Sequence, residues 1–353
     1  MTPRENALKA IHFDIPDYIP ASVRINDSCW HAYPQEFLLE QIEKHPLLFS
    51  TQKLPTTLPY TPSYKLVAQK DIPYIDDWGC TWYTSTNGIT GTVVKHPLTD
   101  WSDLEHFYAP DPKCCTGIGD INWTAESQRL SLLKKSGQLA IGGLRHGHTF
   151  LQLCDIRGYE NLIFDMVDEM PELWTLIDMI EQFNLEIVKK YLSMDIDVIS
   201  FAEDLGMQSG PMLSPNHFRQ YIRPSYKRLM QPVKNKNKLI HMHSDGDIRL
   251  LIDDIIDSGV GIITLQDLVN GIDWIKEHLA GKLCIELDID RQAITPYSTP
   301  TVIHQLIKDE VTKLGTKQGG LMLIYGLYPG LPLENVKAVM DAMEMYAQWY
   351  NYM

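Results

Sequence analysis

Cysteine is scarce in this chain of 353 residues, which has six thiols, at positions 29, 80, 114, 115, 154 and 284. None of them forms a Cys-x-x-Cys pair, and the adjacent pair at 114 and 115 does not have a zinc-binding spacing. Scattered cysteines in a chain of this length are typical of reduced thiols, not of a disulfide framework. We therefore expect a cytoplasmic protein.

Three further absences narrow the class of protein. No apolar run approaches the roughly 18–20 residues that span a bilayer, and the first residues, MTPRENA, lack the apolar core of a signal peptide. Basic residues are outnumbered, with 31 Lys+Arg against 45 Asp+Glu and a net charge of −14, which disfavours binding to nucleic acid. No glycine-rich phosphate loop follows any predicted strand. We expect no membrane and no nucleic acid among its partners.

The first 135 residues contain prolines at short intervals, so we expect an irregular segment without long helices. Within it, Asn87-Gly88 between β-prone residues predicts a hairpin over residues 76–94. Residues 97–107 predict a short helix, with Asp100 or Ser102 as its cap.

From residue 136 onward, short apolar runs alternate with amphipathic helices, of which 171–192, 248–258 and 334–350 are the clearest. The runs are 139–144, 197–202, 239–243, 260–265, 283–287 and 321–325. This alternation predicts parallel strands with right-handed crossovers. With two more strands from 19–25 and the hairpin region, it predicts an α/β fold, a (β/α)8 TIM barrel. We expect one domain over 1–353, in which residues 1–135 partly cover the barrel mouth; a doubly wound open sheet is the alternative.

The predicted strands end in polar residues, where parallel α/β folds place reactive groups. His241, His243 and Asp245 share one face of their strand, and Glu286 shares a face with Asp288. Rows of ionisable groups on barrel strands are costly unless they are paired, hydrated or bound to metal. Two imidazoles with carboxylates suit a zinc ion. A hydrogen-bonded polar plug and a proton-transfer pair without metal are the alternatives.

Two other groups are candidates for contact with a substrate. Trp78 and Tyr325 belong to a set of aromatic residues that could line an apolar pocket, although most such residues are simply core. Arg145 follows the strand at 139–144, where it would bind an anion or lie in a solvated loop.

The sequence resembles the uroporphyrinogen decarboxylase superfamily of (β/α)8 barrels, and within it the zinc-dependent, corrinoid-linked methyltransferases. The matching segments are TPRENALKA (2–10), DWG (77–79), LCDIRGYEN (153–161), EDLGMQ (203–208), SPNHFRQYIRP (214–224), HSDGDI (243–248), DRQ (290–292) and 319–335. The resemblance implies a zinc ion, a corrinoid supplied by a partner protein, and a homodimer.

The chain departs from the family pattern at two places. The arginine-rich motif that handles tetrapyrrole carboxylates in the decarboxylases has only Arg24 here, which disfavours tetrapyrrole decarboxylation. His243 matches the family's His-x-Cys-Gly element, but Asp245 replaces the thiolate, and no cysteine stands near Tyr325-Gly326. A site of imidazole and carboxylate ligands is harder than a thiolate site and favours polarising an oxygen atom.

We therefore predict a methyltransferase that moves a methyl group from a small O- or N-methylated substrate to a protein-bound corrinoid, or from a methylcorrinoid to an acceptor. The predicted metal ligands are His243, Asp245 and Glu286. The predicted catalytic residues are Glu203, His241 and Tyr325, with Glu203 or His241 as the general acid. The predicted substrate-binding residues are Gln266, Arg145 and Trp78. A carboxy-lyase that acts on a small carboxylate without corrinoid is the alternative, and a barrel-based binding protein is the third possibility.

Overall fold

A computed structural model describes residues 1–50, 55 and 57–349. Seven strands form the main sheet, in the order β1-β12-β11-β10-β9-β6-β5. Their bounds are β1 Ala21–Ile25, β5 Ile141–Gly143, β6 Val198–Ala202, β9 Leu239–Ser244, β10 Ile262–Gln266, β11 Cys284–Asp288 and β12 Leu321–Leu327. The pairs β1–β12, β11–β12, β5–β6 and β6–β9 are parallel. The predicted α/β class of TIM-barrel type is confirmed, and each predicted run after residue 136 overlaps a strand.

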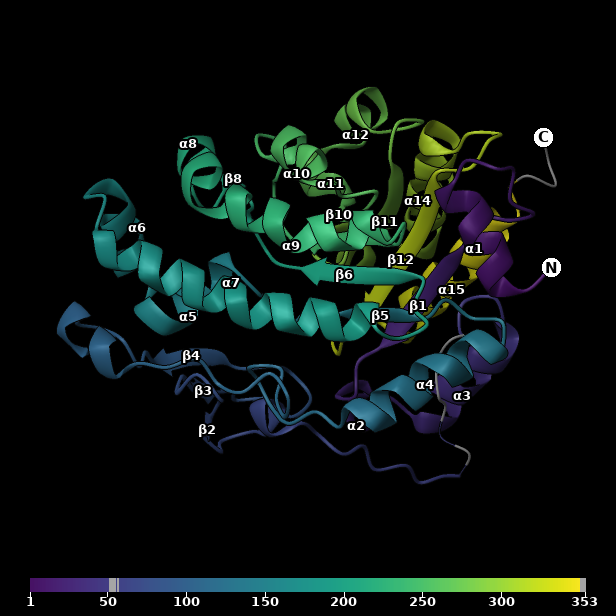
Figure 1. Ribbon diagram of the computed structural model, residues 1–353. Helices are drawn as coiled ribbons and strands as arrows, with labels where there is room; N and C mark the ends of the chain where they lie inside the picture. Colours follow the sequence, from purple (N-terminus) through teal and green to yellow (C-terminus); the bar gives the residue numbers. More distant parts are fainter. Residues whose placement is uncertain (51–54, 56, 350–353) are drawn as a thin grey trace. The chain divides into compact units, whose positions relative to one another are not determined.

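The predicted hairpin exists but does not join this sheet. Strands β2 (Tyr74–Ile75), β3 (Thr81–Tyr83) and β4 (Thr92–Lys95) form a separate antiparallel sheet (Figure 1). Strands close in sequence pair with each other through short connections, whereas a parallel strand needs a long crossover. The main sheet of the described residues therefore has seven strands, and the expectation of a barrel strand from the hairpin region was wrong.

The N-terminal part contains more helix than its prolines predict. Its helices are α1 (Pro3–Ile11), α2 (Cys29–Ala32), α3 (Gln35–Lys44), α4 (Trp123–Lys135) and the 3₁₀ turns η1 (Leu66–Ala68) and η2 (Trp101–His106). Pro3 is the first residue of α1, where a missing N–H costs nothing, and the Thr2 side chain caps the helix. Asp100 caps η2, so the predicted short helix is confirmed in its 3₁₀ form.

The chain divides into two compact units, and the boundary falls inside β10. Unit 1 comprises Met1–Gln69, Thr86–Ile89 and Thr264–Met353, and unit 2 comprises Lys70–Ser85 and Thr90–Ile263. The predicted single-domain organisation stays a prediction.

In unit 2, helix α7 begins at Pro171 and ends at Leu192, as predicted. Its buried face includes Leu173, Leu176, Ile180 and Ile187, and it packs beside α9 (Arg223–Asn235) (Figure 1). The Ser214 hydroxyl caps the short helix α8 (Pro215–His217), which continues through a π-helical turn (η3, Phe218–Ile222) into α9. The other elements of this unit are α5 Phe150–Arg157, α6 Tyr159–Val167, α10 Ile252–Ser258, β7 Gly206–Met207 and β8 Gly210–Pro211.

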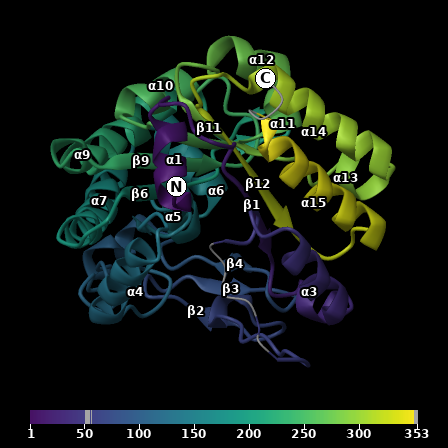
Figure 2. The ribbon, with the colours of Figure 1, turned by 90° about the vertical axis from the view of Figure 1, so that its right-hand side faces the viewer.

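In unit 1, helices α14 (Pro300–Leu314) and α15 (Leu333–Ala347) lie side by side (Figure 2), and α15 packs on β1 and β12. The remaining helices are α11 Asp267–Asn270, α12 Ile272–His278 and α13 Ile294–Tyr297. The predicted helix end at Tyr350 lies outside the described residues. None of the described helices, in either unit, has the length and apolar character needed to cross a membrane.

Candidate active site

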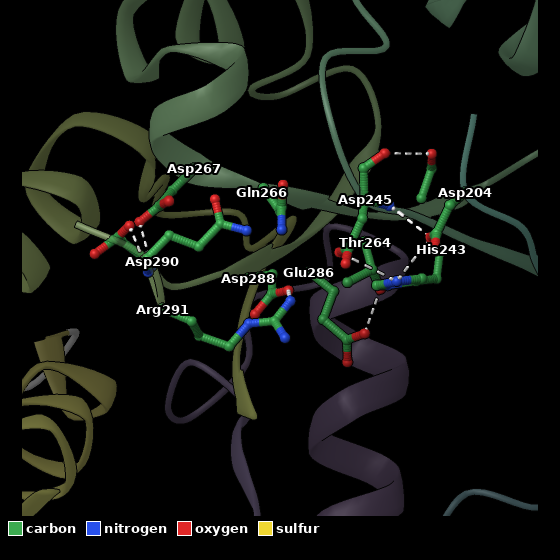
Figure 3. Close-up of polar contacts among 12 residues, drawn as sticks. Asp204, His243, Asp245, Thr264, Gln266, Asp267, Glu286, Asp288, Asp290 and Arg291 are labelled. Atoms are coloured by element: carbon green, nitrogen blue, oxygen red, sulfur yellow. Dashed lines mark hydrogen bonds and ion pairs between the residues drawn. The ribbon is translucent and has the colours of Figure 1, made fainter. Parts of the chain in front are cut away.

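Two histidines and two aspartates gather where β5, β6 and β9 end in unit 2. His146 follows β5, Asp204 follows β6, and His243 lies on β9, where it pairs in register with the last residue of β6. The Asp204 Oδ1 atom lies 3.2 Å from His146 Nε2 and 3.6 Å from His243 Nε2. Asp245 adds a second carboxylate, with its Oδ1 atom 3.4 Å from His243 Nε2 (Figure 3). Parallel pairing thus brings together residues from three separate parts of the sequence.

The electrostatics of this cluster keep Asp204 ionised. Burial works to raise the pKa of Asp204, but the hydrogen bond from His146 and the charges of His146 and His243 outweigh it, so that the pKa lies below its usual value. The backbone N–H of Asp245 also donates to Asp204 Oδ1, at 2.9 Å. The carboxylate is therefore available as an anionic ligand at neutral pH.

Three of these residues have the geometry of a metal site. One ligand atom each from His146, Asp204 and His243 lie within 4.8 Å of one another. Two atoms bound at about 2.1 Å to a tetrahedral zinc ion lie about 3.4 Å apart. The separations of 3.2 and 3.6 Å match that spacing. Three protein ligands with a fourth position left for substrate is the arrangement of catalytic zinc sites.

The predicted ligand set overlaps with this group at one residue. His243 belongs to it, and Asp245 contacts His243 without belonging to the three-residue group. Glu286 lies in unit 1, where the Thr264 hydroxyl donates a hydrogen bond to its carboxylate. The polar strand ends in the sequence include His146 and Asp204, but neither was predicted as a metal ligand. Only the pairing of β5, β6 and β9 brings them to His243.

Glu203, a predicted catalytic residue, lies in a buried network. It is fully buried, and its carboxylate accepts hydrogen bonds from the backbone N–H groups of Thr149 and Leu151, at the start of α5, and from the Tyr226 hydroxyl. The His148 Nε2 atom lies 4.0 Å from this carboxylate. Burial raises the pKa of Glu203 and lowers the pKa of His148 to about 3. These contacts hold the start of α5 against β6.

His241, the other predicted acid, is half-buried on β9 and shares the face of His243. Its Nδ1 atom lies 2.8 Å from the hydroxyl oxygen of Ser200, which pairs with it in register from β6. A hydroxyl can donate to or accept from an imidazole nitrogen, so this contact fixes the orientation of the His241 ring.

Arg145 and Trp78, predicted to contact the substrate, are both buried in unit 2. The Arg145 guanidinium donates to Gln152 at 2.5 Å and to Asp155 at 2.7 Å. Trp78 is 3% exposed and packs edge-on against Phe183, with the ring centroids 5.2 Å apart. These contacts are those of packing residues, and a role in substrate binding stays a prediction.

In unit 1, the polar ends of β10, β11 and β12 form a second group. Gln266 is buried, and Asp288 accepts a hydrogen bond from Arg291 Nη2 at 2.6 Å. Tyr325 is 1% exposed, and its hydroxyl lies 3.1 Å from the Thr295 hydroxyl. Burial is the main cause that raises the pKa of Tyr325.

A buried set of carboxyl groups lies beside these residues (Figure 3 shows Asp267 and Asp290). The Asp290 carboxylate accepts hydrogen bonds from the backbone N–H groups at the start of α13. Asp267 Oδ2 accepts from the Asp290 N–H at 2.8 Å, and burial raises the pKa of Asp267 to about 6. Glu310 of α14 is 1% exposed.

Comparisons with known proteins agree with the fold. A family model described as uroporphyrinogen decarboxylase (URO-D) matches residues 76–346. Uroporphyrinogen decarboxylases of Pseudoalteromonas atlantica and Christiangramia forsetii are 20% and 21% identical over 270 residues, which cover 74% and 73% of this chain and 73% of each relative. A methyltransferase from Methanosarcina mazei superposes with a TM-score of 0.68 and 17% identity, over 98% of this chain and 99% of the other.

Proposed function

The chain belongs to the uroporphyrinogen decarboxylase family, and from this premise we propose that it is a metal-assisted methyltransferase. The observation that carries the proposal is the group of His146, Asp204 and His243 at the ends of three neighbouring strands. The single arginine of the segment 21–30 supports methyl transfer over tetrapyrrole decarboxylation. The Methanosarcina protein of the same fold is named a methyltransferase, which also supports it.

In this proposal, His146, Asp204 and His243 would hold the zinc ion. The ion would supply Lewis acidity at the oxygen or nitrogen that loses the methyl group. The Oδ1 atom of Asp245 lies 3.4 Å from the same Nε2 atom of His243, where it would supply a further carboxylate ligand.

We assign proton delivery to His241. The leaving heteroatom needs a proton when the methyl group departs, and His241 is only half-buried, whereas Glu203 is fully buried by its own partners. Ser200, at 2.8 Å from His241 Nδ1, holds the ring in one orientation. The proposal also keeps the other roles predicted from the sequence. These are Asp245 and Glu286 as ligands, Tyr325 as a catalytic group, and Gln266, Arg145 and Trp78 as substrate contacts.

The methyl acceptor is a corrinoid carried by a partner protein, or a methylcorrinoid is the donor in the reverse direction. The resemblance to corrinoid-linked methyltransferases supports this partner, and it also supports a homodimer. The few scattered cysteines support a cytoplasmic location.

A carboxy-lyase that acts on a small carboxylate is the second candidate, because both curated relatives are named uroporphyrinogen decarboxylase. In that case a histidine of the same cluster would protonate the carbanion, with the aspartates holding its ring, and no metal or corrinoid would take part.

Metal content separates the two candidates first. Protein purified without chelator and loaded with zinc should hold about one equivalent, and His146→Ala or His243→Ala should reduce this to about a tenth or less. His106→Ala removes a histidine of the same unit whose side chain is 78% exposed, and it should keep the zinc. A wild-type protein that holds less than about a tenth of an equivalent would rule out the zinc mechanism.

Methyl transfer is then tested with cob(I)alamin and a panel of methyl ethers and methylamines, by following the spectrum of methylcobalamin. His241→Ala should keep its zinc and lose turnover, whereas His243→Ala should lose both. Release of carbon dioxide from a small carboxylate by metal-free protein would instead establish the lyase.

A further inference from the structure

A cavity of about 420 Å³ opens within unit 1, at the carboxyl end of β12. Tyr325 and Gly326 of β12 line one side, Tyr297 of α13 lines another, and Arg291 and Tyr328 complete it. Its volume falls in the range of small-molecule sites, which are about 300–1,000 Å³. It therefore has room for one small organic molecule.

Long-range hydrogen bonds hold the walls of this cavity in place. The Tyr33 hydroxyl donates to the Tyr328 carbonyl at 3.1 Å and accepts from the Leu331 N–H at 2.9 Å. On the α13 side, the Asn335 side chain donates to the Thr295 and Ser298 carbonyls, both at 2.9 Å. The cavity is thus formed before any ligand binds, which lowers the cost of binding.

One guanidinium group lines the cavity. Arg291 is the only charged residue among the described residues that line it, and no lining residue is acidic. Asp288, which is not among the lining residues, accepts from Arg291 Nη2 at 2.6 Å and fixes the guanidinium. A guanidinium has five N–H donors in a rigid plane, and that plane matches the geometry of a carboxylate.

The other walls favour a flat ligand. Tyr297, Tyr325 and Tyr328 present three aromatic rings, and Pro296 and Pro329 add apolar surface. A side chain at Gly326 would place its Cβ atom 3.1 Å from the Tyr328 ring and 3.6 Å from Arg291, so glycine keeps this end of β12 open. Phenol rings and proline rings contact planar groups over a large area.

The same arrangement disfavours a cation. Three tyrosines could form an aromatic cage for a quaternary ammonium group. However, the Arg291 guanidinium already stands over the Tyr328 ring, 5.7 Å from its centroid. A second cation at this ring would meet a positive charge, so an anion fits where an ammonium ion does not.

We propose that this cavity binds a small planar organic anion, an aromatic or unsaturated carboxylate, whose carboxylate pairs with Arg291 and whose plane packs against Tyr297 and Tyr328. Tyr325, which lines this cavity, is also a catalytic candidate of the proposed function, so the inference rests in part on that function; binding at the cavity is measured without methyl transfer, so the two proposals can fail separately.

Benzoate is the probe, with binding measured by isothermal titration calorimetry on the full chain. Benzamide has the same shape without the charge, and benzyltrimethylammonium carries the opposite charge. We expect benzoate to bind at least about tenfold more tightly than benzamide, because the charge-assisted hydrogen bonds are lost, and benzyltrimethylammonium not to bind. Absence of benzoate binding, or tighter binding of the cation, overturns the proposal.

Variants of the lining residues test whether benzoate binds at this cavity. Arg291→Gln alone would leave the buried Asp288 carboxylate without its partner, so the double variant Arg291→Gln/Asp288→Asn removes the pair together. It should weaken benzoate binding by about tenfold or more. Tyr297 is 84% exposed, so Tyr297→Ala should fold normally and still weaken binding severalfold.

Arg249→Gln is the matched control, because Arg249 pairs with Asp247 at 2.7 Å and does not line the cavity. It should bind benzoate like the wild type. Unchanged affinity in both the double variant and Tyr297→Ala overturns the proposal. Zinc content is measured on the same samples: full zinc with no benzoate binding refutes this site alone, whereas benzoate binding without zinc refutes only the metal mechanism.

Discussion

Glu310→Gln should stabilise the protein above pH 6, because Glu310 is a buried carboxyl group that cannot ionise beside Asp267 without placing two like charges together. Both side chains are 1% exposed, and a hydrogen bond between the two carboxyl groups favours the protonated form of Glu310. Burial, and then the Asp267 charge, raise the pKa of Glu310 well above its ordinary value. The folded protein therefore holds a proton that the unfolded chain releases.

Burial raises the pKa of both carboxyl groups, that of Asp267 to about 6. A rise of this size corresponds to about 3 kcal/mol between the protonated and ionised forms. Because the folded protein keeps a proton on Glu310 that the unfolded chain releases, the contribution of Glu310 to stability is present below about pH 4.5 and falls as the pH rises. Glutamine has no titrating proton, so it should raise the unfolding free energy at pH 8 by about 1–3 kcal/mol.

The assay is urea unfolding of both proteins at pH 4, 6 and 8. We expect equal stability at pH 4, a higher urea midpoint for the variant at pH 8, and a smaller loss of stability between them. Glu334→Gln is the control, since Glu334 is an exposed carboxylate of the same unit. If Glu310→Gln is less stable than the wild type at pH 8 while Glu334→Gln is neutral, Glu310 is an ionised and well-paired group, and the reasoning is refuted.

Two further changes test other parts of the structure by urea unfolding. Glu203→Ala should lower the unfolding free energy by about 3–5 kcal/mol, because it leaves two backbone N–H groups and the Tyr226 hydroxyl buried without their acceptor. A loss below about 1 kcal/mol would contradict this network. Gly117→Ala should cost at least about 1 kcal/mol more than Gly281→Ala. Both glycines have positive φ. A new Cβ atom lies 2.7 Å from Trp78 at Gly117, whereas it meets nothing within 4 Å at Gly281. Equal losses of unfolding free energy in the two variants would show that the loop at Gly117 moves away from the indole.

Much of the barrel could be predicted from periodicity alone. The apolar face of α7 repeats at helical spacing over its whole length, and Pro171 marks its first residue, so its bounds were predicted correctly. The pairing of the strands in the hairpin region could not be predicted in this way, because β-prone residues predict strands without specifying their pairing partners. Pairing is decided by chain connection and by contacts remote in sequence.

The candidate metal cluster shows the same limit at the level of side chains. His243 could be identified because strand alternation placed it in a polar row. Glu203 and Asp204 are neighbours in sequence, yet one is fully buried beneath α5 and the other contacts two histidines. Strand β6 is mostly apolar on both faces, with Ser200 as its polar residue, so its sequence pattern distinguishes the two faces only weakly.

The sequence by itself determined the class of fold and the polar character of the strand ends, because both depend on short-range periodicity and on residue type. Only the tertiary structure decided which polar groups meet. His146, Asp204 and His243 converge because β5, β6 and β9 are neighbours in one parallel sheet. Arg291 and three tyrosines line one cavity because α13 lies next to the end of β12. Such convergence depends on strand order and register, which arise from the packing of the whole chain.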